Sequence, residues 1–216
     1  MVYDRSLALF SPDGRLIQVE YAQKSCEQGS SVIYNINTNI IRVCMESRNQ
    51  NLLLIEDKNK RLACLDPDLN FYASYSGISS DSDHIIRLGR IIIRNYKLQC
   101  GEDILLDQLA EMLSDSIQKN TISRGNRPFG AKIVLFGFQE GVARIYVLEP
   151  DGNYIEYERG AIGQKSDDVL EAIEKKDNGV YVCLEVMKEV VQNDSNRIIM
   201  AEIGQHGVRW LDVEEI

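Results

Sequence analysis

The order in which strand and helix periodicities follow one another is the strongest constraint on the fold of this chain. Short apolar runs predict β-strands at residues 31–36, 39–46, 61–65, 70–76, 131–138, 143–148, 154–158, 198–203 and 208–211. Helical spacing of apolar residues predicts helices between these groups, at residues 15–28, 79–96, 103–120, 166–175 and 180–192. The grouping is not the strict strand–helix alternation of a doubly wound fold. It favours an α+β chain with two stacked antiparallel sheets and helix pairs outside them.

Length and composition fit one ordinary soluble domain. The chain has 216 residues, of which 44% are hydrophobic and 26% charged, enough apolar material for a substantial core. No stretch approaches the ~20 apolar residues of a membrane helix. The start, Met-Val-Tyr-Asp-Arg, carries an acid and lacks the apolar core of a secretory signal. We expect no membrane partner, and a single domain at residues 29–216 behind an N-terminal appendage at residues 1–28.

Charge and reactive residues exclude several classes of function. The net charge of −9 argues against a nucleic-acid binder, which must neutralise phosphates. Five cysteines without a C-x-x-C pair suit a reducing compartment, so we expect the cytoplasm and nucleus. The two histidines, His84 and His206, are far apart in the sequence, and no zinc-type cluster is predicted. We expect no metal and no cofactor.

The appendage has its own local signals. Ser11-Pro12-Asp13-Gly14 predicts a tight turn, since proline supplies φ near −65° and glycine suits the exit. The helix predicted at residues 15–28 carries apolar side chains on more than one face, and Gly29 is its natural stop.

The same region carries a specific family resemblance. The run contains Tyr3-Asp4-Arg5, then Phe10-Ser11-Pro12-Asp13-Gly14, then Gln18-Val19-Glu20-Tyr21-Ala22. It closely resembles the N-terminal signature of proteasome alpha subunits. Among the alpha types, the sequence looks nearest to the fourth eukaryotic one. Later segments agree in order: Gly29-Ser30-Ser31, Glu46-Ser47-Arg48, Tyr75-Ser76-Gly77-Ile78 with Asp81, Arg127-Pro128-Phe129-Gly130, Pro150-Asp151-Gly152 and Ala161-Ile162-Gly163. The stretch between Arg48 and Gly77 diverges most.

The resemblance implies both a fold and a role. The fold is a four-layer α-β-β-α sandwich of the N-terminal-nucleophile hydrolase type. The role is that of a non-catalytic alpha-ring subunit of the proteasome core particle, in ubiquitin-dependent protein degradation. Its implied partners are other alpha subunits in a seven-membered ring, the beta-ring subunits, and the C-terminal tails of regulatory particles.

The resemblance also implies that the chain has no catalytic residue. In beta subunits the nucleophile is a threonine at the mature N-terminus, whose own amine acts as base. The matching position here is Ser30, inside the chain, so its nitrogen is a non-basic amide. Glu46 and Arg48 lie where relatives keep supporting residues, and we interpret them as surface charges at a strand end. Two alternatives remain open: an active threonine-type peptidase processed to an N-terminus at Ser30, and a free-standing monomeric scaffold.

Gate residues are predicted by resemblance in the appendage. In the family, Asp and Arg of neighbouring tails pair across the pore and Tyr bonds to an Asp, which implies the same for Tyr3, Asp4 and Arg5. Pro12 and Tyr21 would form the hinge that regulators move. The alternative is an N-terminus with no fixed structure, the common state of chain ends.

Two further surfaces are predicted. Leu16, Ile17 and Val19 on the helix at residues 15–28 are expected to meet the sandwich and a ring neighbour. The family's pocket lysine, which pairs with the carboxylate of a regulator tail, falls on Arg61, or on Lys60 after a small shift of register. The alternative for Arg61 is an ordinary surface arginine at a strand start.

Overall fold

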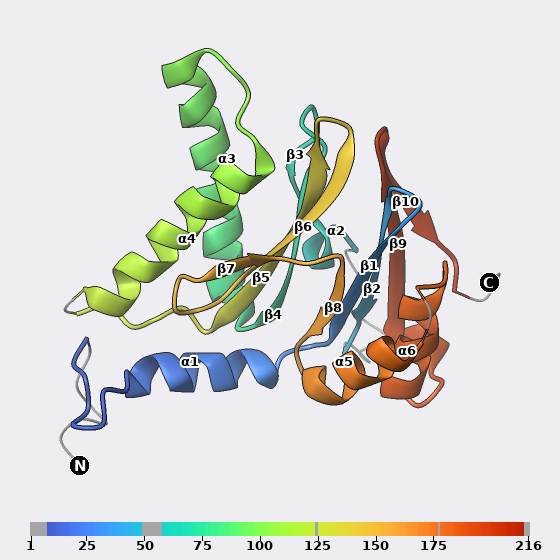
Figure 1. Ribbon diagram of the computed structural model, residues 1–216, viewed down its shortest axis with the longest axis horizontal. Helices are drawn as coiled ribbons and strands as arrows, with labels where there is room; N and C mark the ends of the chain where they lie inside the picture. Colours follow the sequence, from blue (N-terminus) through green and yellow to red (C-terminus); the bar gives the residue numbers. More distant parts are fainter. Residues whose placement is uncertain (1–7, 49–57, 124, 177, 214–216) are drawn as a thin grey trace, which may run out of the picture.

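The computed structural model describes residues 8–48, 58–123, 125–176 and 178–213, and within them two antiparallel sheets of five strands each face one another (Figure 1). The first sheet has the order β10-β9-β2-β1-β8 and is built from β1 (Val32–Asn37), β2 (Ile40–Glu46), β8 (Arg159–Ile162), β9 (Ile198–Gly204) and β10 (Gly207–Leu211). The second has the order β3-β4-β5-β6-β7 and is built from β3 (Ala63–Asp66), β4 (Phe71–Gly77), β5 (Ala131–Gln139), β6 (Val142–Leu148) and β7 (Tyr154–Glu156).

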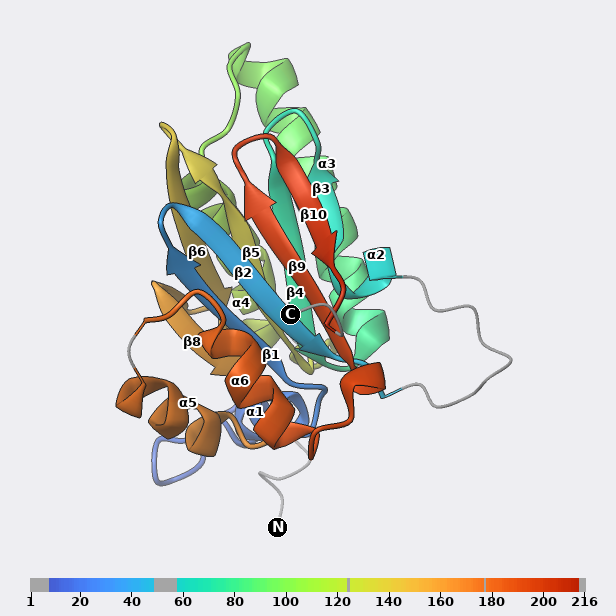
Figure 2. The same ribbon diagram turned by 90° about the vertical axis from the view of Figure 1, so that its right-hand side faces the viewer.

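Helices cover the outer face of each sheet. The second sheet is covered by α3 (Ser79–Cys100) and α4 (Leu106–Ile122), and the first by α5 (Ser166–Lys175) and α6 (Val182–Val190), as Figures 1 and 2 show. One end of the sandwich is crossed by α1 (Ile17–Glu27), which packs against β4 and β5. The predicted four-layer α-β-β-α sandwich is confirmed.

Strand alternation sorts the apolar residues into three core layers. On β5, Ile133 and Leu135 face α3 and α4, whereas Val134 and Phe136 face the other sheet. Successive side chains of a strand point to opposite faces, so a strand covered on both sides needs apolar residues at consecutive positions. The near-continuous apolar runs of the sequence therefore indicate strands buried between a helix layer and a second sheet.

Two elements were not predicted from the sequence. The strand β8 is only four residues long and contains a glycine, and it is defined by its antiparallel pairing with β1. The short helix α2 (Lys58–Arg61) lies where a strand was predicted to begin, and β3 starts only at Ala63. The pairing of β8 depends on β1, which is distant in the sequence. Among the described residues, no helix is long and apolar enough to cross a membrane.

Candidate functional site

The position that corresponds to a catalytic nucleophile lies in a continuous backbone between α1 and β1. Ser30 is half-buried, and the chain runs through it from the end of α1 into the first strand. The backbone N–H of the next residue, Ser31, donates to Glu46 Oε2 at 3.1 Å. An amide nitrogen in a peptide bond cannot take up a proton as a free amine does, so Ser30 has no base of the kind that threonine peptidases use.

Glycines let the end of α1 touch the end of β4. A Cβ at Gly29 would lie 2.1 Å from the backbone nitrogen of Gly77 and 2.2 Å from Ser76 Oγ. Gly77 has φ +108°, and a Cβ there would lie 2.2 Å from the carbonyl oxygen of Gly130. The three glycines therefore mark backbone segments packed against one another, which fixes where α1 leaves the sandwich.

The interpretation of Glu46 as a surface charge is wrong. Its side chain is only 5% exposed, and Oε2 accepts hydrogen bonds from Ser31 N–H and from Arg48 Nε, both at 3.1 Å. Oε1 accepts a further bond from Arg197 Nη2. Burial by itself would raise the pKa of Glu46, but the Ser31 amide and the two guanidinium groups outweigh it and lower this pKa. Both oxygens of this buried carboxylate accept hydrogen bonds, because β2 ends between β1 and the start of β9.

Arg48 is also more than a strand-end charge. Its Nη1 donates to the carbonyl of Gln28 at 2.9 Å, and Nη2 donates to the carbonyl of Gly29 at 2.8 Å. Nη2 also donates to Gln164 Oε1 at 2.8 Å, while Nε is held by Glu46. Gln28 is the C-cap of α1, so this guanidinium binds carbonyls that a helix end leaves without intrahelical partners.

The turn Arg127-Pro128-Phe129-Gly130 supports the C-terminal part of α1. Asp81 in the first turn of α3 accepts bonds from Arg127 Nη1 at 2.6 Å, Arg127 Nη2 at 2.8 Å and the N–H of Gly130 at 2.9 Å. A Cβ at Gly130 would lie 3.2 Å from Ser25 Oγ of α1. The Arg127-Pro128-Phe129-Gly130 motif therefore has a structural role: it forms part of the surface on which α1 packs.

The residues expected on α1 lie on different faces of the helix. Val19 is buried against the sandwich, Leu16 and Ile17 are half-buried, and Tyr21 is 52% exposed. The preceding turn is formed as predicted: Gly14 N–H donates to the carbonyl of Ser11 at 2.9 Å, and Pro12 is exposed. The predicted gate residues Tyr3, Asp4 and Arg5 lie outside the described residues.

Arg61 does not fit the alternative of an ordinary surface arginine at a strand start. It is the last residue of α2, and its guanidinium lies over the ring of Tyr75, 5.0 Å from the centroid. Its Nε and Nη2 are shielded from solvent and have no hydrogen-bond partner within the described part of the chain. Burial lowers the pKa of this group. Lys60 is exposed.

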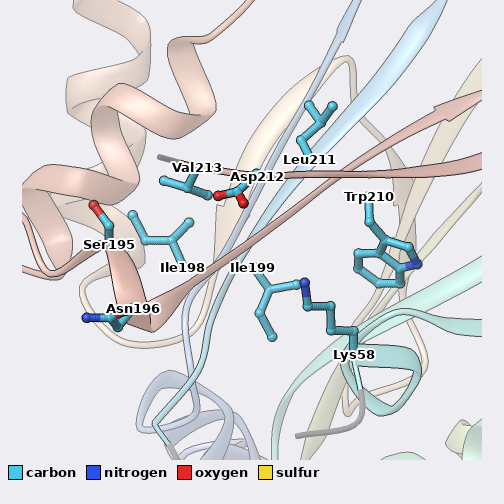
Figure 3. Close-up of a pocket in the computed structure, with 9 residues that line it drawn as sticks. All are labelled: Lys58, Ser195, Asn196, Ile198, Ile199, Trp210, Leu211, Asp212 and Val213. Atoms are coloured by element: carbon cyan, nitrogen blue, oxygen red, sulfur yellow. The ribbon is translucent and has the colours of Figure 1, made fainter. Parts of the chain in front are cut away.

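A hollow of about 390 Å³ lies between Lys58 of α2, the start of β9 and the end of β10 (Figure 3). Trp210 and Ile199 form part of its wall, and Lys58 Nζ points into it from α2. The described residues that line it include neither Lys60 nor Arg61, so this hollow is separate from the predicted tail pocket. Among the described residues, no group of three or more His, Cys, Asp or Glu could hold a metal ion.

Comparisons with known proteins identify the family. The family model for proteasome subunits matches residues 26–201, and the model for the N-terminal signature of A-type proteasome subunits matches residues 3–24. An alpha type-7-like proteasome subunit of Macaca fascicularis is 30% identical, over 93% of this chain and 84% of that protein. The alpha type-8 proteasome subunit of Mus musculus is 29% identical with the same coverage, and an alpha-type proteasome subunit of Saccharolobus islandicus is 33% identical over 81% of this chain and 72% of its own.

The two matches divide the chain between the appendage and the sandwich. The signature of alpha subunits covers the segment that leads into Ser30, so the alternative of an active peptidase is not favoured. The chain belongs to the proteasome subunit family, as one of the alpha-type members that form the non-catalytic ring of the core particle.

Proposed function

We propose that this subunit helps to close the pore of its ring and provides a docking pocket for regulator tails. The observation that carries the gate is the match of the alpha signature to residues 3–24, joined to a helix that is fixed at one end of the sandwich. The segment before Ser11 leads into this helix. Ten residues can span up to ~35 Å when extended, which is long enough to reach a central pore.

The gate residues form contacts that suit a switch. Tyr3, Asp4 and Arg5 would pair with the tails of neighbouring alpha subunits through exposed bonds. A surface ion pair is worth only ~0.2–1 kcal/mol, so several such pairs can close a pore and still be broken by a regulator. Pro12, in its exposed turn, and Tyr21 on the outer face of α1 are the hinge positions of this proposal.

Deleting residues 2–9 in the assembled core particle tests the gate. The deletion should raise basal hydrolysis of small peptides and leave the cleavage preference unchanged, because the beta-ring sites are untouched. Particles must first be shown to be intact by native gel and mass spectrometry. If intact particles with the deletion hydrolyse peptides at the normal basal rate, the tail of this subunit is not a closing element.

Arg61 supports the proposal of a carboxylate pocket. Arg61 Nε and Nη2 are buried and have no hydrogen-bond partner among the described residues, so they carry an unfavourable desolvation cost that a bound anion would relieve. These two N–H groups form one edge of the fork, and that edge can bind both oxygens of a carboxylate. The C-terminal carboxylate of a regulator tail is the proposed occupant, at the seam between this chain and a ring neighbour.

A charge reversal tests this pocket. Arg61→Glu should weaken binding of a regulator tail peptide to the core particle, and Lys60→Glu is the matched control one residue away. Loss of binding with Lys60→Glu alone would move the pocket to Lys60. Unchanged binding with both variants, by a regulator known to use this seam, would remove the assignment.

The ring contact and the location complete the proposal. Leu16 and Ile17 are only half-buried in the isolated chain, which leaves apolar area for a ring neighbour, whereas Val19 already packs on the sandwich. Five free cysteines, three of them buried, suit the reducing environment of the cytoplasm and nucleus.

A further inference from the structure

The joint between α1 and the sandwich includes hydrogen bonds from the sandwich to backbone carbonyls at the end of the helix. Three groups at the helix end are involved: the carbonyl of Cys26 accepts from Ser76 Oγ at 2.9 Å, and the carbonyls of Gln28 and Gly29 accept from Arg48. The carbonyl of Gly29 also accepts from the N–H of Gln164 at 3.0 Å. The donors come from β4, from the residues just after β2 and from the segment after β8. Three separate parts of the sandwich therefore bind the end of α1.

Arg48 has the central place in this joint because it connects two sets of groups. On one side its Nη1 and Nη2 bind the helix end, where the aligned peptide dipoles concentrate partial negative charge. On the other side its Nε is held by Glu46, whose carboxylate is itself fixed by Ser31 and Arg197. A guanidinium held at Nε has a fixed plane, so its two remaining nitrogens set the direction of the carbonyls they bind.

We propose that Arg48, supported by Glu46 and Arg197, is a positioning residue for the gate: it sets the angle at which α1 leaves the sandwich. This inference rests on the proposed gate. The turn at Ser11–Gly14 lies at the other end of α1 from the joint, so a small tilt at the joint would move this turn by a larger distance. The hydrogen bonds are directional, whereas the burial of Val19, Ala22 and Cys26 depends little on the orientation of α1.

The decisive experiment is a double-mutant cycle in the assembled particle. Arg48→Met keeps the unbranched apolar part of the side chain and removes the guanidinium, and with it the bonds that Arg48 donates to the carbonyls of Gln28 and Gly29. It should raise basal peptide hydrolysis severalfold without changing the cleavage preference. In a particle that already lacks residues 2–9, the same substitution should add nothing, because a tail that is absent cannot be displaced. Arg209→Met, an exposed arginine on β10, is the matched control and should leave basal hydrolysis unchanged.

Hydrogen exchange gives a reading that does not depend on the gate. In Arg48→Met the backbone amides of α1 should exchange faster, while those of α4 keep their protection. Gln164→Ala removes one partner of Arg48 and is a milder variant, with a smaller rise in hydrolysis, should Arg48→Met fail to assemble.

The outcomes separate the inference from the proposed function. If the tail deletion leaves basal hydrolysis unchanged, the proposed gate fails. If the deletion raises it but neither Arg48→Met nor Gln164→Ala does, the gate stands and Arg48 does not position it. If Arg48→Met raises hydrolysis equally in particles with and without the tail, its effect arises elsewhere and the inference is wrong.

Discussion

Two helices of this chain are attached to the same sandwich in different ways. The helix α4 buries Leu106, Leu109, Leu113 and Ile117 almost completely, each no more than 1% exposed. The helix α1 buries only Val19, Ala22 and Cys26, and its C-terminal end is held by side chains that bind its carbonyls.

The two kinds of attachment contribute differently to the stability of the domain and to the orientation of a helix. Burying one large apolar side chain contributes ~1.5–3 kcal/mol and depends little on orientation. A single hydrogen bond contributes a net ~0.5–1.5 kcal/mol but requires a defined geometry. We infer that α4 holds the domain together, and that the joint of α1 specifies where the N-terminal helix points. A change at α4 should lower stability, and a change at the joint should first alter geometry.

The largest loss of stability is expected from Leu113→Ala on α4. Removing a fully enclosed leucine leaves a cavity between α3, α4 and the second sheet, at a cost of ~2–5 kcal/mol. Urea unfolding of the purified chain, followed by the fluorescence of Trp210, measures it. A loss below ~1 kcal/mol would mean that α4 is not the stabilising element of the comparison.

The second effect concerns the close contact at Gly29. Gly29→Ala would bring a methyl group to 2.1 Å from the nitrogen of Gly77, so α1 must move away from β4. Overpacking of this kind costs ~1–3 kcal/mol. Gly204→Ala is the control, because a Cβ there meets nothing within 4 Å. Equal unfolding midpoints for the two variants would show that the joint tolerates displacement without cost.

The third effect is the acid dependence of the joint. The pKa of Glu46 is lowered from 4.5, so its bonds stabilise the fold above that value and are lost as pH falls through the lowered pKa. Glu46→Gln should cost ~1–3 kcal/mol at pH 7 and less at a second pH below the lowered pKa of Glu46, because the native carboxylate is then also protonated. Unfolding curves at the two pH values, with exposed Glu111→Gln as control, give the comparison. A cost for Glu46→Gln that is the same at both pH values would contradict the role of its charge.

The smallest effect is expected at Leu98, on α3 beside α4. Its side chain is 84% exposed, so Leu98→Ala should change the free energy of unfolding by no more than ~0.5 kcal/mol. The same denaturant titration applies. A loss as large as that of Leu113→Ala would indicate that burial in the isolated chain is a poor guide to what stabilises this helix pair.

Local sequence signals predicted most of the elements. Helix α5 was predicted with its observed bounds, Ser166–Lys175, because its polar and apolar positions alternate with helical period. The turn at Ser11–Gly14 was predicted from proline and glycine alone. By contrast, β8 is a strand because β1 lies beside it, and no property of Arg-Gly-Ala-Ile by itself requires that pairing.

The candidate site divides in the same way. The sequence by itself determined the family signature, the position of Ser30 within a continuous chain, and therefore the lack of a free amine there. Only the tertiary structure decided that Glu46 is buried, that Arg48 binds the end of α1 and that Arg61 lies over Tyr75. A local sequence pattern reflects the secondary-structure preferences of residues that are neighbours along the chain. The burial and partners of a charged side chain depend on segments that only folding brings together, and for Glu46 one of these is Arg197, 151 residues away.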